Sequence, residues 1–139
     1  MKKVIYLFVL AAFLSACNSE PRFVIKGKIS GSDSVTFLLQ KRDAGKIVTI
    51  DSSVVKKGSF KMKGKVAYPE LVQLIALNTP YRTSFYLENS EISVTGKLDS
   101  LFNAKVTGSR TQDEYNSLIE STKPLSEKYS GLVQEYQAA

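Results

Sequence analysis

Few residues of this 139-residue chain could do chemistry, and their types restrict what that chemistry would be. The sequence has no His and a single Cys, Cys17, so a Ser-His-Asp triad, a Cys-His pair, an internal disulfide and a CxxC redox pair are excluded. Metal sites built on His or on several thiolates are excluded for the same reason. We therefore expect a protein that is not an enzyme, without catalytic residues, cofactor-binding residues or metal ligands.

Cys17 stands in a context that predicts lipid attachment. Two basic residues, Lys2 and Lys3, precede eleven consecutive apolar residues at 4–14, which suits a signal peptide and is too short to span a bilayer. Leu14-Ser15-Ala16-Cys17 then matches the bacterial lipobox, an aliphatic residue and two small ones before Cys. An ordinary secretory signal with a chance Cys near its cleavage site is the alternative.

The lipobox divides the N-terminal part of the chain. We expect residues 1–16 to be removed as a lipoprotein signal peptide and 17–22 to form a lipidated tether, with acyl chains such as palmitate on Cys17. This predicts a cell-envelope protein anchored to the membrane, facing the periplasm or the outer surface. The mature chain keeps 17 of the 19 Lys and Arg residues and all 13 acids, a net charge of +4, which is too low for a nucleic-acid binder.

Two groups of polar residues could be interpreted as catalytic, but each has a simpler explanation. Glu88 and Glu91 flank a tight turn, as a pair of glycosidase carboxylates would, yet acids beside turns are usually only solvated. The hydroxyls of Asp51-Ser52-Ser53 have no base to activate them, so a hydrogen-bonding cluster at a strand end is expected.

Two further groups could bind ligands. Lys61, Lys63 and Lys65, with Lys56 and Lys57 nearby, form either a basic stripe for anionic lipid head groups or an acidic partner, or simply one solvated strand face that also deters edge pairing. A group of aromatic residues near Arg82 has two possible roles. It forms either a rim that binds a ligand, or it packs in the core and against the C-terminal helix. This group consists of Tyr81, Phe85 and Tyr86.

The elements that must position these residues are short strands. From Phe23 onward apolar residues alternate with polar ones, and turn clusters such as Ser30-Gly31-Ser32-Asp33 separate the runs. The segment 71–77 is almost continuously apolar, which predicts a strand buried on both faces. About eight strands result, so we expect a mainly β domain over 23–108, an antiparallel sandwich or a barrel-like sheet. Its core should include Phe37, Phe60, Leu74 and Val94.

A helical connector is predicted over 109–139. A capping box at Ser109-Arg110-Thr111-Gln112 opens it, and Pro124 should kink or break it. Apolar residues at helical spacing form a stripe that continues almost to the end, so the helix looks cut off and we expect the natural chain to continue. The stripe consists of Leu125, Tyr129, Leu132, Val133 and Tyr136, and its partner is either the protein's own sheet, a second protomer or a missing C-terminal domain.

Several short motifs together resemble a known family, the domain of unknown function 4369. They are Phe23-Val-Ile-Lys-Gly-Lys-Ile-Ser-Gly31, Ile50-Asp-Ser52 with Gly58-Ser-Phe60, Phe85-Tyr-Leu-Glu88 with Ile92-Ser-Val-Thr-Gly96, and Val106-Thr-Gly-Ser109 with Gln112-Asp-Glu-Tyr115. In Gram-negative bacteria this module typically follows a lipobox and precedes a thioredoxin-like domain of a thiol:disulfide oxidoreductase.

The resemblance implies a non-catalytic accessory domain that positions a redox domain at the membrane or selects its client. The redox CxxC pair would belong to a C-terminal domain that this chain lacks, because no Cys follows Cys17. The alternative is a free-standing envelope lipoprotein that binds a glycan, a peptide or a protein partner. Membrane, redox domain and protein client are therefore the expected partners, and nucleic acid is not.

Overall fold

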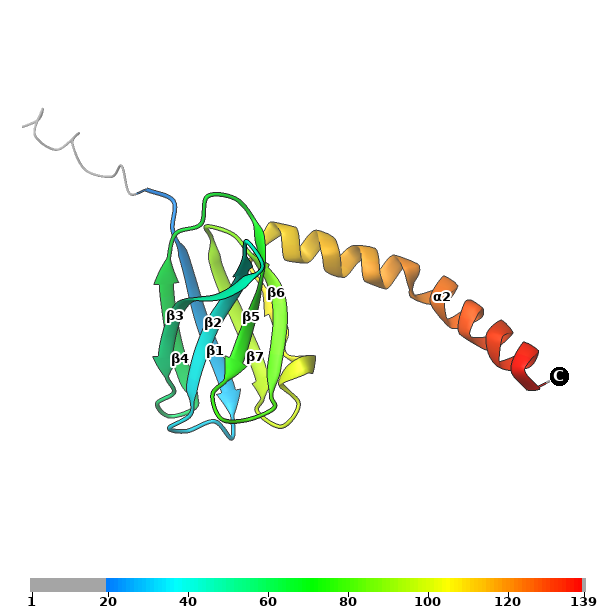
Figure 1. The fold of residues 1–139 in the computed structure, drawn as a ribbon, viewed down its shortest axis with the longest axis horizontal. Helices are drawn as coiled ribbons and strands as arrows, with labels where there is room; N and C mark the ends of the chain where they lie inside the picture. Colours follow the sequence, from blue (N-terminus) through cyan, green and yellow to red (C-terminus); the bar gives the residue numbers. More distant parts are fainter. Residues whose placement is uncertain (1–19, 139) are drawn as a thin grey trace, which may run out of the picture.

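The computed structural model describes residues 20–138, which form two β-sheets and one long helix (Figure 1). Turn signals in the sequence separate eight strands, a short 3-10 helix and the C-terminal helix. These elements are β1 (Phe23–Ser30), β2 (Thr36–Asp43), β3 (Lys46–Val54), β4 (Ser59–Gly64), β5 (Glu70–Ala76), β6 (Arg82–Leu87), β7 (Glu91–Lys97), η2 (Leu101–Asn103), β8 (Lys105–Thr107) and α2 (Arg110–Ala138). Across this described range, no helix is both long and apolar enough to cross a membrane.

The strands divide into two four-stranded sheets that pack face to face. Sheet A has the order β4-β1-β7-β8, and sheet B has the order β3-β2-β5-β6. The mainly β fold with a C-terminal helix is confirmed, and of the two expected architectures the chain adopts the sandwich. Short turns join most strands that follow one another in the sequence. Four non-glycine residues of the described chain adopt a positive φ in these turns, among them Ala44 and Lys57.

One strand pair departs from the antiparallel arrangement that short turns favour. β1 and β7 run parallel, from Val24 beside Glu91 to Ser30 beside Lys97. Between them the chain passes through β2 and β3 of sheet B, returns for β4 and leaves again for β5 and β6. This crossing between sheets brings β7 back in the direction of β1, and such long-range pairing carries no local sequence signal.

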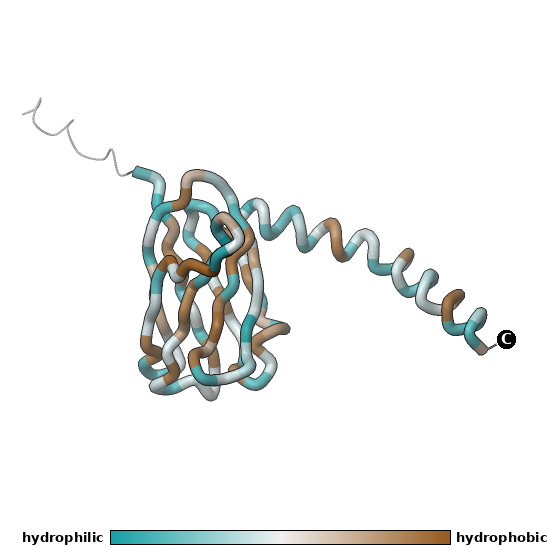
Figure 2. The backbone as a smooth tube through the Cα atoms, viewed as in Figure 1, coloured by the Kyte–Doolittle hydropathy of each residue, from teal (hydrophilic) through white to brown (hydrophobic). Residues whose placement is uncertain are grey.

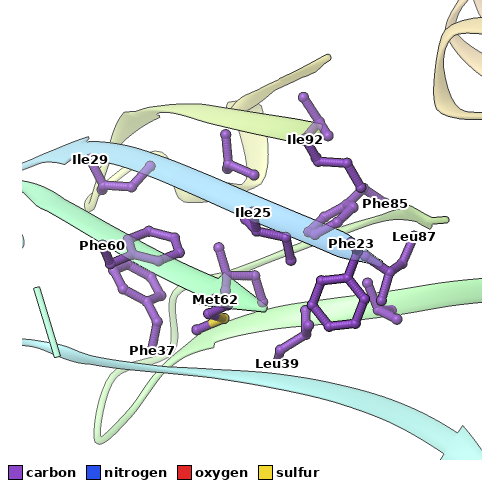
Figure 3. Close-up of a cluster of buried hydrophobic side chains, with 14 of the residues drawn as sticks. Phe23, Ile25, Ile29, Phe37, Leu39, Phe60, Met62, Phe85, Leu87 and Ile92 are labelled. Atoms are coloured by element: carbon purple, nitrogen blue, oxygen red, sulfur yellow. The ribbon is translucent and has the colours of Figure 1, made fainter. Parts of the chain in front are cut away.

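The inward side chains of both sheets form one hydrophobic core (Figure 3). All four predicted core residues are buried there, and the rings of Phe37 in sheet B and Phe60 in sheet A stack with centroids 4.9 Å apart. Phe60 lies against Gly27 of β1, where an added Cβ would come within 1.9 Å of the ring. Gly27 is therefore required by the close approach of an aromatic ring to the neighbouring strand.

The outer face of sheet B is partly open, which contradicts the prediction that β5 is buried on both faces. Val72 and Leu74 point into the core, whereas Leu71 keeps 56% of its surface exposed and Gln73 is exposed. The apolar run does not show whether another element covers the outer face of its strand, and α2 leaves the sandwich instead of covering this face (Figure 1).

α2 contacts the sandwich only at its first turns. It touches β6 and β8, the edge strands of the two sheets on one side of the molecule, and then projects into solvent (Figure 1). Pro124 lies inside the helix and does not end it, and the ribbon changes direction about midway along α2. Apolar segments recur along the projecting part (Figure 2). Because Leu125, Tyr129 and Tyr136 are each at least 69% exposed, the first of the three alternatives for this stripe, packing on the protein's own sheet, is wrong.

Candidate functional site

The outer surface of sheet A concentrates positive charge. Because successive side chains of a strand point to opposite faces of the sheet, 13 residues of sheet A point outward. They are six Lys, five Ser or Thr, one Glu and one Val. We call this surface the lysine face. Its lysines are Lys26 and Lys28 on β1, Lys61 and Lys63 on β4, Lys97 on β7, and Lys105 on β8.

Strand register arranges these residues in rows across the sheet. One row runs from Lys61 through Lys26 and Ser93 to Thr107, and the next from Ser59 through Lys28 and Thr95 to Lys105. Lys26 and Lys61 are direct cross-strand neighbours, an arrangement of like charges that destabilises a sheet. Lys61 and Lys63 of the predicted lysine stripe are thus part of a larger surface that includes the sheet's interior strand β1. Lys65 lies beyond the end of β4, and its ammonium pairs with Glu20 at 2.9 Å.

A single acid on the lysine face neutralises part of this charge. The ammonium of Lys26 donates a 2.6 Å hydrogen bond to Glu91 Oε1 from the adjacent strand β7. This hydrogen bond, helped by the positive charge of Lys26, lowers the pKa of the Glu91 carboxyl below its ordinary value. Both side chains are more than half exposed, so the pair contributes little to stability.

A shallow groove of about 700 Å³ crosses the lysine face toward the β3 edge of sheet B. Gly27 and Phe60 are among the residues that line it. The polar lining consists of four lysines and four hydroxyl residues, namely Lys26, Lys28, Lys56, Lys61, Ser53, Ser59, Ser93 and Thr95. None of the groove's lining residues, all within the described chain, is acidic. Ammonium and hydroxyl groups in this arrangement can donate hydrogen bonds to an anion.

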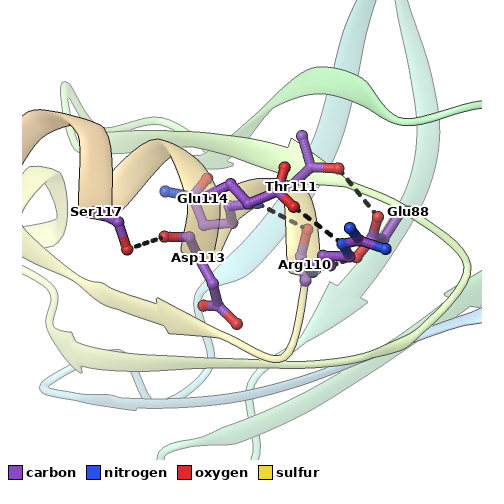
Figure 4. Close-up of polar contacts among 8 residues, drawn as sticks. Glu88, Arg110, Thr111, Asp113, Glu114 and Ser117 are labelled. Carbon is purple, nitrogen blue, oxygen red and sulfur yellow. Dashed lines mark hydrogen bonds and ion pairs between the residues drawn. The ribbon is translucent and has the colours of Figure 1, made fainter.

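The two turn-flanking acids have separate structural roles. Glu91 pairs with Lys26 on the lysine face, whereas Glu88 caps the first turn of α2 (Figure 4). The Glu88 carboxylate accepts hydrogen bonds from the backbone N–H of Arg110 and, at 3.1 Å, from the Thr111 hydroxyl. A carboxylate at this position satisfies orphan N–H groups and complements the positive end of the helix dipole.

The capping box at the start of α2 forms only in part. Ser109 Oγ accepts the Gln112 backbone N–H at 3.2 Å, as predicted. The Gln112 side chain does not turn back to Ser109, however. Its Oε1 accepts the backbone N–H of Tyr86 at 2.8 Å, and its Nε2 donates to Asn116 Oδ1 at 2.7 Å. Gln112 is the one buried residue of α2 in the described part of the helix, and it joins the helix to the edge strand β6.

The three residues of the aromatic group have different surroundings. Phe85 is buried in the core, and Tyr81 is partly buried against it. Tyr86 contacts Tyr115 of α2 edge to face, with ring centroids 5.5 Å apart. The prediction that these residues serve the core and the helix contact is therefore confirmed.

Asp51 makes the expected hydrogen-bonding cluster, although within β3 and not at its end. Its Oδ1 accepts the Ser52 backbone N–H at 2.8 Å, and its Oδ2 accepts the Lys63 backbone N–H of β4 at 3.1 Å. The second contact links sheet B to sheet A. In residues 20–138, no three His, Cys, Asp or Glu side chains are grouped to hold a metal ion.

Cys17, the predicted lipidation site, lies outside the described residues, as do the predicted signal peptide and the start of the tether. Two functional features were not predicted from the sequence. One is that the lysines of β1 lie beside those of β4, and the other is the hydrogen bond between Gln112 and Tyr86. The alternation of Lys26 and Lys28 was a signal for the first, but only the β1–β4 pairing shows that the two sets of lysines are neighbours.

Comparison with known families adds two matches. Residues 23–115 match the family described as Domain of unknown function (DUF4369). Residues 1–18 match the prokaryotic membrane lipoprotein lipid attachment site. No curated protein and no solved structure shows significant similarity to the chain.

Proposed function

Because the chain belongs to the family described as Domain of unknown function (DUF4369) and carries a lipoprotein lipid attachment site, we propose that it is a non-catalytic accessory domain of an envelope redox protein. In this role Cys17 is the acylated anchor and the sandwich is a scaffold. α2 connects the scaffold to a thioredoxin-like domain, which carries the CxxC chemistry. The accessory domain holds the redox domain near the membrane and contributes to the choice of client.

The observation that carries this proposal is the projection of α2. Its apolar side chains remain exposed beyond the first turns, with 70% of Leu125 and 56% of Leu132 open to solvent. A stripe of this kind is normally covered by another surface. The sandwich does not cover it, so a further domain or a partner is the natural occupant.

The attachment of α2 to the sandwich also suits a connector. Glu88, Ser109 and Gln112 hold its first turn by hydrogen bonds, and Tyr115 packs on Tyr86. These contacts fix the direction in which the helix leaves. A domain at its far end would be held at a defined place relative to the sandwich, about 40 Å away by the length of a 29-residue helix.

The proposal is tested by the size and activity of the native protein. We expect an immunoblot of host membranes, with mass spectrometry, to detect a lipidated species about 100–150 residues longer with a CxxC-bearing peptide. The isolated mature chain should show no insulin-reducing activity above a Cys17→Ser control. A native species that ends at Ala139 would refute the link to a redox domain, and thiol-dependent turnover would refute the non-catalytic role.

A free-standing binding lipoprotein is the second candidate, and the groove on the lysine face favours it. Limited proteolysis separates the two functions. An isolated connector should lose the exposed part of α2 rapidly, for example by trypsin after Lys128, and leave the sandwich intact. A free-standing lipoprotein should resist this trimming. Saturable self-association through the stripe on α2 would instead support a structural or assembly lipoprotein.

A further inference from the structure

We propose that the lysine face docks on the anionic phospholipid surface of the membrane that holds the lipid anchor. This inference goes beyond the accessory role and does not depend on it, because it concerns sheet A and the tether alone. It assigns the sandwich a preferred side toward the bilayer, with sheet A against the head groups and sheet B facing away.

The first argument is the distribution of charge. Six lysines and one glutamate give the lysine face a net charge of +5. The mature chain from Cys17 to Ala139 has a net charge of +4, so everything outside this face sums to −1. The net charge of the mature protein is therefore concentrated on one side of the sandwich, as expected for docking on an extended negative surface.

The second argument is that protection of sheet edges does not explain these lysines. Lys on an edge strand deters pairing with other chains, which would account for β4 and β8. Lys26 and Lys28, however, lie on β1, which has β4 on one side and β7 on the other. Lys26 lies directly beside Lys61, which adds repulsion within the sheet, and that repulsion is relieved when lipid phosphates lie over the rows.

The third argument is the chemistry between the lysines. Ser59, Ser93 and Thr95 lie in the same rows, and each presents a hydroxyl within the groove. Hydroxyls can donate to phosphate oxygens, and ammonium groups add charge with three donors each. The surface is open and its rows repeat Lys and hydroxyl residues, which suits an array of head groups better than one small anion in an enclosed site.

The tether and β1 are short enough to keep the lysine face near the head groups. Six Cα-to-Cα steps lead from Cys17 to Phe23, the first residue of β1, and an extended chain of that length spans at most about 20 Å. The eight residues of β1 extend about a further 26 Å. The anchor thus confines the lysine face close to the head groups, where each Lys raises binding about fivefold. A surface that binds the membrane only weakly can then stay bound, because the acyl chains already hold the protein at the membrane.

Vesicle co-sedimentation of the mature chain with Cys17→Ser tests this docking without the contribution of the acyl chains. We expect binding to phosphatidylcholine vesicles that contain phosphatidylglycerol, little binding to phosphatidylcholine alone, and loss of binding as salt is raised. The triple variant Lys28→Gln, Lys61→Gln, Lys105→Gln removes three lysines that form no ion pair in the described structure. It should lower the partition coefficient about 100-fold.

A matched control changes the same charge elsewhere. Lys46→Gln, Lys123→Gln, Lys128→Gln removes three exposed lysines from β3 and α2, and it should lower binding far less. Equal losses in the two triple variants, or no binding to anionic vesicles at low salt, would overturn the proposal. Binding of soluble polyphosphate without binding to vesicles would also overturn it, in favour of a soluble polyanion. Circular dichroism of both variants checks that the sandwich remains folded.

Discussion

Replacing Gln112 with Ala tests whether one side chain fixes the direction of α2. Gln112 is only 6% exposed. Its side-chain amide accepts the Tyr86 N–H of β6 and donates to Asn116 of α2, and its backbone N–H donates to Ser109 Oγ in the helix cap. The substitution removes the first two contacts and leaves the third. Tyr86 lies on the edge strand β6, so its N–H then has no strand on that side to replace the lost acceptor.

The magnitude follows from these contacts. Leaving a buried donor without its acceptor costs about 1–3 kcal/mol, and the lost bond to Asn116 adds about 0.5–1 kcal/mol at a more exposed position. Ala is a better helix former than Gln by a few tenths of a kcal/mol, and water can reach half-buried Tyr86 in part. We therefore expect a net loss of about 1–2 kcal/mol, or a fall in Tm of about 4–8 °C for a domain of this size.

Denaturation and hydrogen exchange together measure the effect. The Tyr86 amide should exchange faster in Gln112→Ala, while amides in the interior strand β7 change only by the global loss of stability. Gln134→Ala is the matched control, because this Gln lies on the exposed part of the same helix. If both substitutions alter stability equally, or if Tyr86 exchange is unchanged, the role assigned to Gln112 is wrong.

Three further predictions concern the lysine face, the core and the helix. Lys26→Gln should raise the pKa of Glu91 back toward its ordinary value, as followed by NMR titration. The pKa of Glu91 is lowered in the folded protein, so the small stabilisation from this pair is present above about pH 4.3 and is lost as the pH falls through the folded pKa. The Lys26→Gln variant lacks this stabilisation and should therefore lose less stability on acidification. Gly27→Ala should cost about 1–3 kcal/mol in urea denaturation through its clash with Phe60, whereas Gly131→Ala, with open space around its Cβ, should stabilise by up to about 1 kcal/mol. Deleting 124–138 should change the stability of the sandwich by less than about 0.5 kcal/mol in the same assay, and a larger loss would show that the projecting helix packs on it.

The sequence predicted the local elements well because their signals are local. Alternation of apolar and polar residues, with the apolar run at 71–77, predicted about eight strands, and the structure has eight in its described residues. The inward positions Phe37 and Val94 followed from the alternation. The start of α2 followed from Ser109, whose hydroxyl caps the helix as expected. Alternation could not show which strands are neighbours. The parallel pairing of β1 with β7 joins residues about 67 positions apart, and nothing at either strand announces the other.

The same limit explains what was missed at the candidate sites. Lys61 and Lys63 could be recognised as one strand face, but their proximity to Lys26 depends on the β1–β4 register. Gln112 fitted a capping box by its spacing, yet tertiary structure offered its side chain a better partner at the edge of β6. The apolar run at 71–77 predicted burial on both faces, but burial of the outer face depends on tertiary packing that the run does not encode.

The two candidate surfaces lie on different parts of the sandwich, which allows them to act independently. The lysine face belongs to the outer side of sheet A, and its groove opens toward the β3 edge. α2 is held on the opposite side, where β6 and β8 form the edges of the two sheets. Strand β8 belongs to both surfaces, because it carries Lys105 and also contacts the first turns of α2, whereas Lys26 on β1 and Lys61 on β4 lie two and three strands away from β8. Substitutions at separated positions without shared partners behave additively. A domain that docks through one side and displays a helix from the other can therefore be altered in its membrane contact without altering what its helix presents. This separation is the property that an anchored accessory module needs.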